Sequence, residues 1–515
     1  MTDDTEPFNR LTPKESRLHA RRFRRACLLT VLGVGGMFVL FNAFAPNRPV
    51  EYETAQNHFF YGSFGSDISG GIPLKVLQVL PHVFPEHLPE GAESRDYTAF
   101  GFIQEPGKRM PIGFSIRRQF IDYAGLNCAA CHTGAVRETR DDEPRVIPGM
   151  PANTVDLLSY FEFLFQSAAD KRFTSQKILE AMREEGIAEP LDGIIYPLVV
   201  PRMKEGLLEQ RDRLEPFLGP DYPSWGPGRV NTFDPFKFDQ FHSYYEDQDQ
   251  TIEETYGIVD NPSVWNQAKR DSLWLHWDGN NNSAIERNFS AAIAAGAAPQ
   301  DMDVNSLLRI QNWLDSLPAP DYPYAIDEDL AQRGESIYQT HCADCHSYQG
   351  ERVGRVVPIE EIGTDRHRLD SYTGFLLNVQ KKYTAGYEWQ FEHFRNTNGY
   401  ANRPLDGIWA RAPYLHNGSL PTMRDLLRPV EERPDAFTRG STVYNRQELG
   451  FVHQELSARS DSVYVRPDGS PYTGTSFIYD TSLPGNDNKG HTGPGYGTEL
   501  STEKKQALIE YLKTL

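Results

Sequence analysis

Two copies of a CxxCH motif constrain this chain more than any other feature of its sequence. The first, "CAACH", spans 128–132, and the second, "CADCH", spans 342–346. Of the five cysteines in the chain, only Cys27 lies outside them, so no pair of cysteines is left for a structural disulfide. The spacing is the attachment pattern of covalently bound haem.

The chemistry of haem attachment requires this spacing. Each thiol adds to one vinyl group of the porphyrin, and the adjacent histidine turns its imidazole onto the iron as the proximal ligand. A structural zinc site instead needs four converging ligands, usually from paired motifs close together. A redox dithiol leaves the histidine after both cysteine pairs unexplained. We therefore expect two haem c groups, held by Cys128, Cys131, Cys342 and Cys345 and ligated by His132 and His346.

An apolar run near the N-terminus predicts a membrane anchor. Residues 26–45 contain no charge, and about 20 such residues are enough to cross a hydrocarbon core. A cleavable signal peptide normally has a shorter apolar region, although Ala43 and Ala45 form a small-x-small pattern before Pro46. Basic residues gather in 1–25, so this end is expected to be cytoplasmic. The rest of the chain is then expected in the periplasm, anchored to a bacterial inner membrane by a single pass.

The charge balance differs on the two sides of this run. Residues 1–45 carry 7 Lys/Arg and 4 Asp/Glu, which leaves 45 basic and 67 acidic residues, a net charge of −22, in the remainder. A domain this acidic is not expected to bind nucleic acid. Its charge either steers a positively charged redox partner or simply keeps the protein soluble, and the sequence leaves both readings open.

The two motifs divide the chain into two modules. The Pro-rich, acidic stretch 318–329 is the expected linker, between a first cytochrome c-like haem domain at 46–317 and a second at 330–515. Apolar residues at helical spacing precede Cys342, and the C-terminal "STEKKQALIEYLKTL" has an apolar stripe with Ser501 as its N-cap. Two such helices packed across each other are typical of a cytochrome c domain. The expected fold is mainly α with long loops, behind a single N-terminal transmembrane helix.

Several longer stretches resemble one family. The chain resembles the bacterial di-haem cytochrome c peroxidase superfamily in "WNQAKRDSLWLHWDGNNNSAIERNFSAAIAAGA" and "RPLDGIWARAPYLHNGSLPTMRDLL". It is similar to the rubber-oxygenase (RoxA)-like branch in "NHFFYGSFGSD", "GLNCAACHTG", "GPGRVNTF", "RPDAFTRGSTVY" and "NKGHTGPGYGTELS". The resemblance covers roughly residues 50–515. It implies haems near a domain interface, electron transfer between them, and reaction of one with peroxide or dioxygen.

For the haem at His346, the resemblance implies a second histidine ligand. His491 lies in the glycine-rich loop "NDNKGHTGPGYG", which can fold over the haem face. His416, in "APYLHNGS", matches a family histidine that lies near the haem without ligating iron. The methionine that ligates this iron in typical family peroxidases would fall near Val430, and none is there, while Met423 is more typical of a core residue. This departure favours bis-histidine ligation.

For the haem at His132, the second axial position is less defined. His58, His242 and Met150 are candidates, but a core or polar role is as typical of each. An open or weakly ligated iron is therefore expected, and with it the reaction centre. Trp277, in "HWDGN", matches the region where family members place an aromatic side chain between the haems, with ordinary core packing as the alternative.

Three charged residues near "HWDGN" and "GPGRV" have candidate roles. Glu286 is a carboxylate that could move protons for peroxide cleavage. Arg287 and Arg229 are expected to pair with a carboxylate or a haem propionate, because a bidentate pair offsets the desolvation of a buried arginine.

Two functions follow. In the first, a peroxidase-like oxidoreductase passes electrons from the His346 haem to a reactive His132 haem that reduces peroxide or activates oxygen. In the alternative, both irons are six-coordinate and the chain is a membrane-tethered electron carrier. A third reading, oxygenase cleavage of a hydrophobic polymer, comes from the resemblance alone and suits a membrane anchor poorly. The expected electron donor is a small cytochrome, a cupredoxin or a quinol-oxidising chain.

Overall fold

A small antiparallel sheet leads into the first CxxCH motif. The computed structural model describes residues 48–515 except 216–217, 220–221, 235, 247, 249–250 and 460–462. The sheet has the order β1-β3-β4-β2 and consists of β1 (Arg48–Pro49), β2 (Ile72–Pro73), β3 (Phe114–Arg118) and β4 (Tyr123–Leu126). The short helix η3 (Cys128–Ala130) follows β4 after a single residue, so the sheet fixes where the motif begins.

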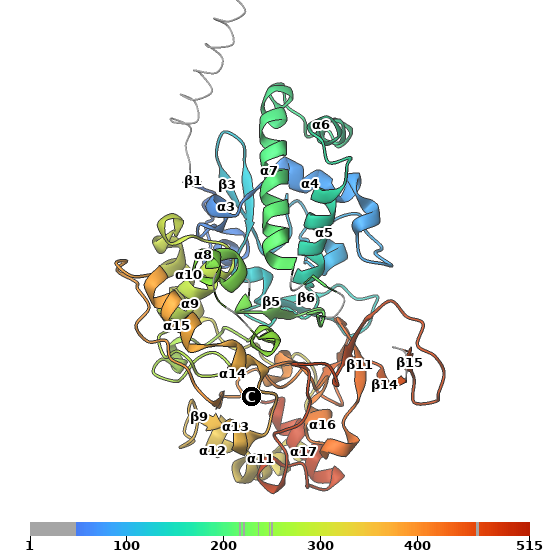
Figure 1. The fold of residues 1–515 in the computed structure, drawn as a ribbon. Coiled ribbons are helices and arrows are strands. Elements are labelled where there is room, and N and C mark those ends of the chain that lie inside the picture. Colours follow the sequence, from blue (N-terminus) through green and yellow to red (C-terminus); the bar gives the residue numbers. More distant parts are fainter. Residues whose placement is uncertain are drawn as a thin grey trace, which may run out of the picture.

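Helices cover this sheet and enclose the N-terminal apolar core (Figure 1). They are α2 (Ala55–Tyr61), α3 (Ser66–Ser69), α4 (Leu74–Val83), α5 (Leu157–Ala169), α6 (Ser175–Glu184) and α7 (Asp192–Leu214). The side chain of Asp156 starts α5 by accepting the N–H of Ser159 at 3.1 Å. In the core the rings of Phe100 and Phe114 meet the ring of Tyr160 edge to face, at 6.0 and 5.8 Å, which aromatic pairs favour.

The middle of the chain supplies two ladders and a second helical layer. The ladders pair β5 (Thr133–Val136) with β6 (Arg145–Pro148), and β7 (Arg229–Asn231) with β8 (Ile258–Asp260). The helices are α8 (His242–Tyr245), α9 (Ala284–Ala294), α10 (Val304–Ser316), α14 (His367–Ser371) and α15 (Gly374–Tyr383). Because β8 ends at Asp260, the residues after it leave the ladder and enter the space between the two CxxCH motifs.

A crossed pair of helices frames the second motif. α11 (Glu328–His341) packs against α17 (Thr502–Leu512), and Gly334 permits the close approach, since a Cβ there would lie 2.0 Å from the Ala507 carbonyl oxygen. The hydroxyl of Ser501 accepts the N–H of Lys504 at 3.4 Å, which confirms the predicted cap. The other helices are α12 (Ala343–His346), α13 (Ile359–Ile362) and α16 (Met423–Leu426).

Short strands fill the rest of the C-terminal part. A four-stranded antiparallel sheet has the order β15-β14-β11-β16, from β11 (Ala436–Arg439), β14 (Glu455–Arg459), β15 (Val463–Val465) and β16 (Phe477–Asp480). Two further ladders pair β9 (Val356–Pro358) with β10 (Gly399–Ala401), and β12 (Tyr444–Asn445) with β13 (Gly450–Phe451).

The predicted linker is packed rather than free. Residues 318–327 form neither helix nor strand, but the indole N–H of Trp409 donates to the Pro320 carbonyl at 2.7 Å. The ring of Tyr322 meets the same indole at 5.7 Å. The division into domains at 46–317 and 330–515 stays a prediction.

Two expectations from the sequence are wrong. The described part of the chain is not mainly α, because 40% of it is helix and 13% is strand. The sequence pattern did not indicate the strands because each has only two to five residues, too few to show an alternation. Some of them also pair with segments far along the chain, as β1 does with β3 and β11 with β16. In addition, the described residues contain no helix that is both long and apolar enough to cross a membrane. Residues 26–45 lie outside the described part, and the predicted single-pass inner-membrane protein with periplasmic haem domains is not upheld.

Candidate haem-binding sites

The second CxxCH motif faces a cavity, here called the second site. Cys342, Cys345 and His346 line it, and its walls are largely apolar, with Val357, Ile362, Leu405, Ile408, Leu426, Leu427, Leu508 and Leu512. Nδ1 of His346 lies 2.7 Å from the Arg403 carbonyl oxygen. A carbonyl only accepts, so Nδ1 carries the proton and Nε2 keeps its lone pair for a metal.

His491 lies across this cavity from His346. The centres of the two imidazole rings are 6.2 Å apart, and their planes are inclined by 41°. An imidazole nitrogen binds a metal at about 2 Å, so two imidazoles that ligate one ion from opposite sides have ring centres about 6 Å apart. The separation of the two rings meets this requirement.

The ionisation of these side chains suits haem attachment. Burial lowers the pKa of His491 to about 3, and it also lowers that of His346. Both imidazoles are therefore neutral at pH 7, the form that ligates a metal. Burial raises the pKa of Cys342 to about 12, and both cysteines of the motif are free.

A wall of the cavity matches a known family. Residues 399–438, which include Arg403 and His416, match the family described as RoxA-like, cytochrome c-like. The chain contains a cytochrome c-like domain. That domain binds haem c, and the free thiols, the neutral histidines and the apolar cavity fit this group.

Two proteins of Sinorhizobium fredii are similar to the chain over longer stretches. The uncharacterized protein y4iM is 31% identical over 300 residues, which are 50% of this chain and 64% of y4iM. The uncharacterized protein y4iJ is 26% identical over 536 residues, covering 82% of this chain and 85% of y4iJ. The chain thus spans less than two thirds of y4iM but most of y4iJ, so the similarity extends well beyond residues 399–438.

The first site surrounds the motif at 128–132. Asn127 caps η3, because its side-chain oxygen accepts the N–H of Ala129 at 3.0 Å. The amide nitrogen of the same side chain donates to the carbonyls of Phe60 and Gly62, at 3.2 and 3.1 Å. One buried asparagine therefore shapes the turn and fastens it to the end of α2.

His132 is oriented in the same way as His346. Its Nδ1 lies 2.8 Å from the Pro262 carbonyl oxygen, which leaves Nε2 with a lone pair. Burial lowers the pKa of His132 to about 4 and raises the pKa of Cys128 and of Cys131 to about 12. Both motifs thus present two protonated thiols and one neutral imidazole whose tautomer is fixed by a backbone carbonyl.

The segment 260–263 joins the two sites. It follows β8, and the Pro262 carbonyl that holds His132 belongs to it. All four residues also line the cavity of the second site. The Asp260 carbonyl accepts the indole N–H of Trp277 at 2.9 Å, and Trp277 lines the same cavity. The indole is therefore tied to the same short segment that orients His132.

Arg403 continues this connection on the other side of Trp277. Its guanidinium lies 4.7 Å from the centre of the indole ring, within the range of a cation–π contact. Its backbone carbonyl holds His346. A continuous run of contacts, called here the bridge, joins His132 to His346 through residues 260–262, Trp277 and Arg403.

Positive charge without a protein counter-charge gathers beside the bridge. Arg270 and Arg411 each lie 2.9 Å from Asp406, but neither Arg287 nor Arg403 forms an ion pair with a carboxylate in the part of the chain that is described. Burial is the main cause that lowers the pKa of Arg287, to about 10, and that of Arg403. Unpaired buried cations favour an anion, and the propionates of haem are anions.

The three candidates for the far side of His132 lie in different surroundings. The side chain of His242 is 48% exposed, and its Nε2 lies 3.7 Å from the Glu246 carboxylate. His242 is therefore a surface residue. Met150 is fully buried in an apolar cluster of the core. His58 is buried on α2, which packs against η3, and neither of its ring nitrogens has a hydrogen-bond partner. Of the three, His58 is the buried histidine, and both of its ring nitrogens lack a partner.

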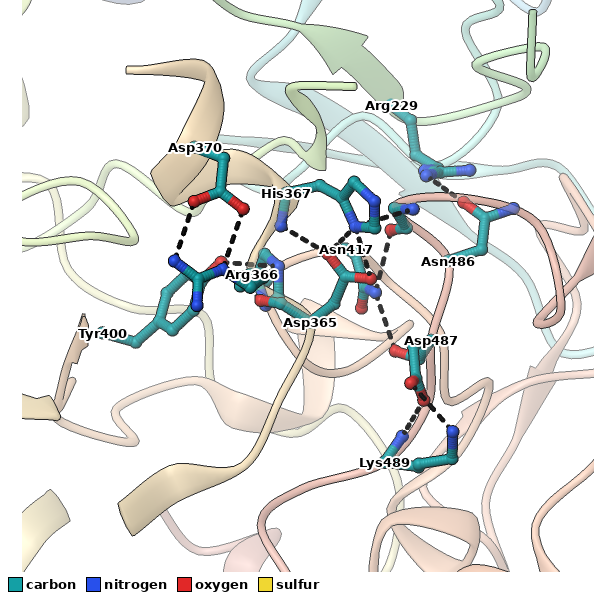
Figure 2. Close-up of polar contacts among 12 residues, drawn as sticks. Arg229, Asp365, Arg366, His367, Asp370, Tyr400, Asn417, Asn486, Asp487 and Lys489 are labelled. Carbon is teal, nitrogen blue, oxygen red and sulfur yellow. Dashed lines mark hydrogen bonds and ion pairs between the residues drawn. The ribbon is translucent and has the colours of Figure 1, made fainter. Parts of the chain in front are cut away.

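His416 has a polar partner of its own. Its Nε2 lies 3.0 Å from the hydroxyl of Tyr400, and the two rings stack at 4.2 Å. The same hydroxyl donates to the Asp365 carbonyl at 2.7 Å, and the Asp365 carboxylate lies 3.0 Å from Nδ1 of His367 (Figure 2). Because its Nε2 is engaged, His416 is better suited to a place beside the haem than to ligation of iron.

Glu286 and Arg229 contact other groups than those expected from the sequence, which were a proton-transfer site for Glu286 and a carboxylate or haem propionate for Arg229. The Glu286 carboxylate accepts the backbone N–H groups of Glu392 and His393, each at 3.0 Å. It therefore fastens a loop to α9. Arg229 is fully buried and donates to the side chain of Asn486 at 2.6 Å (Figure 2), and it is not among the residues that line the cavity.

Sequence reasoning missed Arg403, Pro262 and Asn127. Arg403 is the first residue of the stretch "RPLDGIWARAPYLHNGS", so the resemblance had already marked its surroundings. Pro262 contributes a backbone carbonyl, which carries no residue-type pattern. Asn127 immediately precedes the first cysteine, and an asparagine before a helical turn is a recognised cap, which was the available clue.

Proposed function

We propose that this chain is a di-haem c-type cytochrome and an oxidoreductase. Electrons enter at the second site and reach the first, where a small oxidant, peroxide or dioxygen, is reduced. The observation that carries the proposal is the bridge from His346 to His132. Haem c bound at both motifs would supply a redox-active iron at each end of it.

The second site is the one suited to electron transfer. The 6.2 Å between the ring centres of His346 and His491 supports a pair that would hold one iron. Two strong ligands would leave no position for an oxidant. The two neutral, buried imidazoles need no change of protonation to ligate iron. The apolar wall would keep water away from a bound iron.

The first site is the one suited to reaction. Within the described ranges, no histidine ring faces His132 as His491 faces His346. A single fixed imidazole leaves one side of a bound iron for a small molecule. His132 and Trp277 are then the residues that act in catalysis, the first as ligand and the second as the indole through which the electron arrives.

The electron donor is proposed to be a small redox protein, a cytochrome or a cupredoxin. The cavity of the second site reaches partly exposed residues, among them His341, Arg352 and Tyr496. Exposed Asp344 is the sequence neighbour of Cys345 at this opening, and exposed Glu361, which pairs with Arg352, is the neighbour of Ile362. A basic face on the partner would be attracted there, with a rate that falls as salt rises.

The test is an absorption and EPR spectrum of the oxidised holoprotein. We expect one low-spin and one high-spin iron, and a shift of the high-spin signal when peroxide is added. Two low-spin irons that bind neither cyanide nor, after reduction, CO would disprove reaction at the first site.

The alternative, a non-catalytic electron carrier, is favoured by one residue. His58 is buried with both ring nitrogens unpartnered, and its helix packs against η3. If it ligates the first iron, His58→Ala converts a low-spin signal to high spin. If the first site instead reacts with peroxide or dioxygen and His58 is no ligand, this substitution should leave the spin state unchanged.

A further inference from the structure

Hydrogen bonds fasten the loop that carries His491 at several places, and the backbone N–H of His491 itself donates to the Ile362 carbonyl at 2.8 Å. At its start, the side-chain amide of Asn417 donates to the carbonyls of Gly485 and Asp487, at 3.1 and 2.9 Å (Figure 2). At its end, backbone carbonyls of the loop accept hydrogen bonds from Arg433, a residue that is 5% exposed. The attachment at Arg433 lies next to the imidazole and therefore controls where it points.

The guanidinium of Arg433 donates to backbone carbonyls. Nη1 donates to the carbonyl of Asn488 and, at 2.9 Å, to that of Gly490. Nη2 donates to Leu426 at 3.1 Å and to His491 at 3.4 Å. One planar fork thus ties the His491 loop to the end of α16. Nε donates to the Arg428 carbonyl at 3.3 Å. No carboxylate of the described residues forms an ion pair with the guanidinium, so its hydrogen bonds go to backbone carbonyls of the loop and of residues 426–428.

His491 needs such support because its backbone is strained. Its φ is +47°, in the left-handed region that residues other than glycine avoid. The preceding Gly490, at φ +85°, lies so near the Thr364 amide nitrogen that a Cβ would come within 2.4 Å. Nδ1 of His491 is buried without a partner, whereas Nδ1 of His346 is held by a carbonyl.

We propose that Arg433 is the positioning residue for His491 at the second site. The inference rests on the proposed function, in which His491 ligates the iron bound there. Without the guanidinium, the carbonyls of 488–491 lose their common donor. The strained backbone then relaxes and withdraws the imidazole, while His346 stays, because α12 and the Arg403 carbonyl hold it.

The experiment compares oxidised holoproteins with Arg433→Gln and Arg433→Lys. A lysine keeps the charge but cannot donate as a planar fork to both segments. We expect the high-spin fraction by EPR to rise about tenfold or more in both, as the loss of charge-assisted hydrogen bonds implies. Added imidazole should restore the low-spin signal, which a general loss of folding would not allow. The matched control is Arg424→Gln on α16, which removes partly exposed contacts with Glu448 at 3.6 Å and Gln506 at 3.4 Å and leaves the His491 loop untouched.

The outcomes separate the inference from the proposed function. Folded Arg433 variants with the spectrum of the native protein overturn the inference, and so does a high-spin signal that imidazole does not reverse. If only the Gln variant changes, charge rather than the fork is responsible, and the positioning role is rejected. His491→Ala tests the ligand itself: an unchanged spectrum there removes the assignment on which the inference rests. If the Gln variant does not fold, the Lys variant decides.

Discussion

The guanidinium of Arg403 lies 4.7 Å from the centre of the Trp277 ring, and the backbone carbonyl of the same residue binds Nδ1 of His346 at 2.7 Å. Arg403 therefore contacts both a histidine of the second site and the indole that leads to the first. Trp277 is bound in turn to the Asp260 carbonyl. A change in either side chain should alter how the two sites communicate.

Substitution of Trp277 should slow electron transfer between the sites. Trp277→Leu removes both the ring and the N–H that binds Asp260, and we expect the rate to fall by about 10- to 100-fold, the range seen when supports of a metal's ligands are lost. Trp277→Phe keeps an aromatic ring, so the rate of electron transfer should fall less in this variant. Stopped-flow absorbance that follows the reduction of each haem separately measures the rate. A Leu variant as fast as the native protein would show that the bridge is not the route.

Substitution of Arg403 should make Trp277 easier to oxidise. A positive charge over an indole opposes the loss of an electron from the ring. Arg403→Gln removes this charge and leaves the backbone carbonyl that binds His346. Arg395, whose guanidinium lies 3.1 Å from the centre of the Trp274 ring, offers the matched control Arg395→Gln. After addition of peroxide, we expect EPR to show a larger yield of tryptophan radical in Arg403→Gln but not in Arg395→Gln. Equal yields in the two variants would contradict this role of Arg403.

The sequence predicted the parts of the site that depend on residue type and spacing. The CxxCH motifs fix Cys342, Cys345 and His346 on one turn of chain, and the glycine-rich loop before the last helix made His491 a ligand candidate. The Nδ1 atoms of His132 and His346, in contrast, contact the backbone carbonyls of Pro262 and Arg403, and any residue type can provide a carbonyl. Such partners become visible only when the tertiary structure is known.

The fold was predictable to a similar extent. The cap at Ser501 and the helices around the second motif follow from local pattern, and the structure has them. The strand at 436–439 was not predicted, because its pairing partner at 477–480 is separated from it by about 40 residues. Gly334 lies at helical spacing before Cys342, but the spacing alone does not show that the crossing of α11 and α17 depends on the absence of a side chain there.

Substitution of Gly334 should destabilise the protein. Gly334→Ala places a Cβ where the Ala507 carbonyl oxygen lies 2.0 Å away, so α11 and α17 must separate, and overpacking of this kind costs about 1–3 kcal/mol. Gly206, inside α7, is the matched control, because no atom lies within 4 Å of an added Cβ. Gly206→Ala should stabilise by about 0.5–1 kcal/mol through the helix. Thermal denaturation measures the stability of both variants. A shift of the melting temperature in the same direction for both would contradict the packing role of Gly334.

The His367–Asp365 pair should stabilise the fold only in a window of pH. The hydrogen bond that the imidazole donates to Asp365 is the main cause that raises the pKa of His367 above 6.5. Burial raises the pKa of Asp365, but the hydrogen bond from His367 and the nearby His416 outweigh it, so that the pKa lies below 3.8.

Because the folded pKa of His367 is raised, the stabilisation is fully present below pH 6.5 and is lost as the pH rises through the folded value. Below pH 3.8 it fades again as Asp365 is protonated. His367→Gln should therefore lower the free energy of unfolding by about 1 kcal/mol at pH 5 and by little at pH 9, which urea denaturation at the two pH values measures. A loss that is equal at both contradicts the pair's role.

Removal of one cysteine pair should halve the haem content. A variant with Cys342→Ser and Cys345→Ser can no longer attach haem at the second site, while the thiols of Cys128 and Cys131 are untouched. We expect the mass of the denatured protein to fall by one haem, the haem-to-protein ratio by half, and the melting temperature to drop, since a group that binds only the folded state stabilises it. Cys27→Ser is the control and should keep the full load. A double variant that retains all of its covalent haem, or that loses all of it while folded, argues against one haem at each motif.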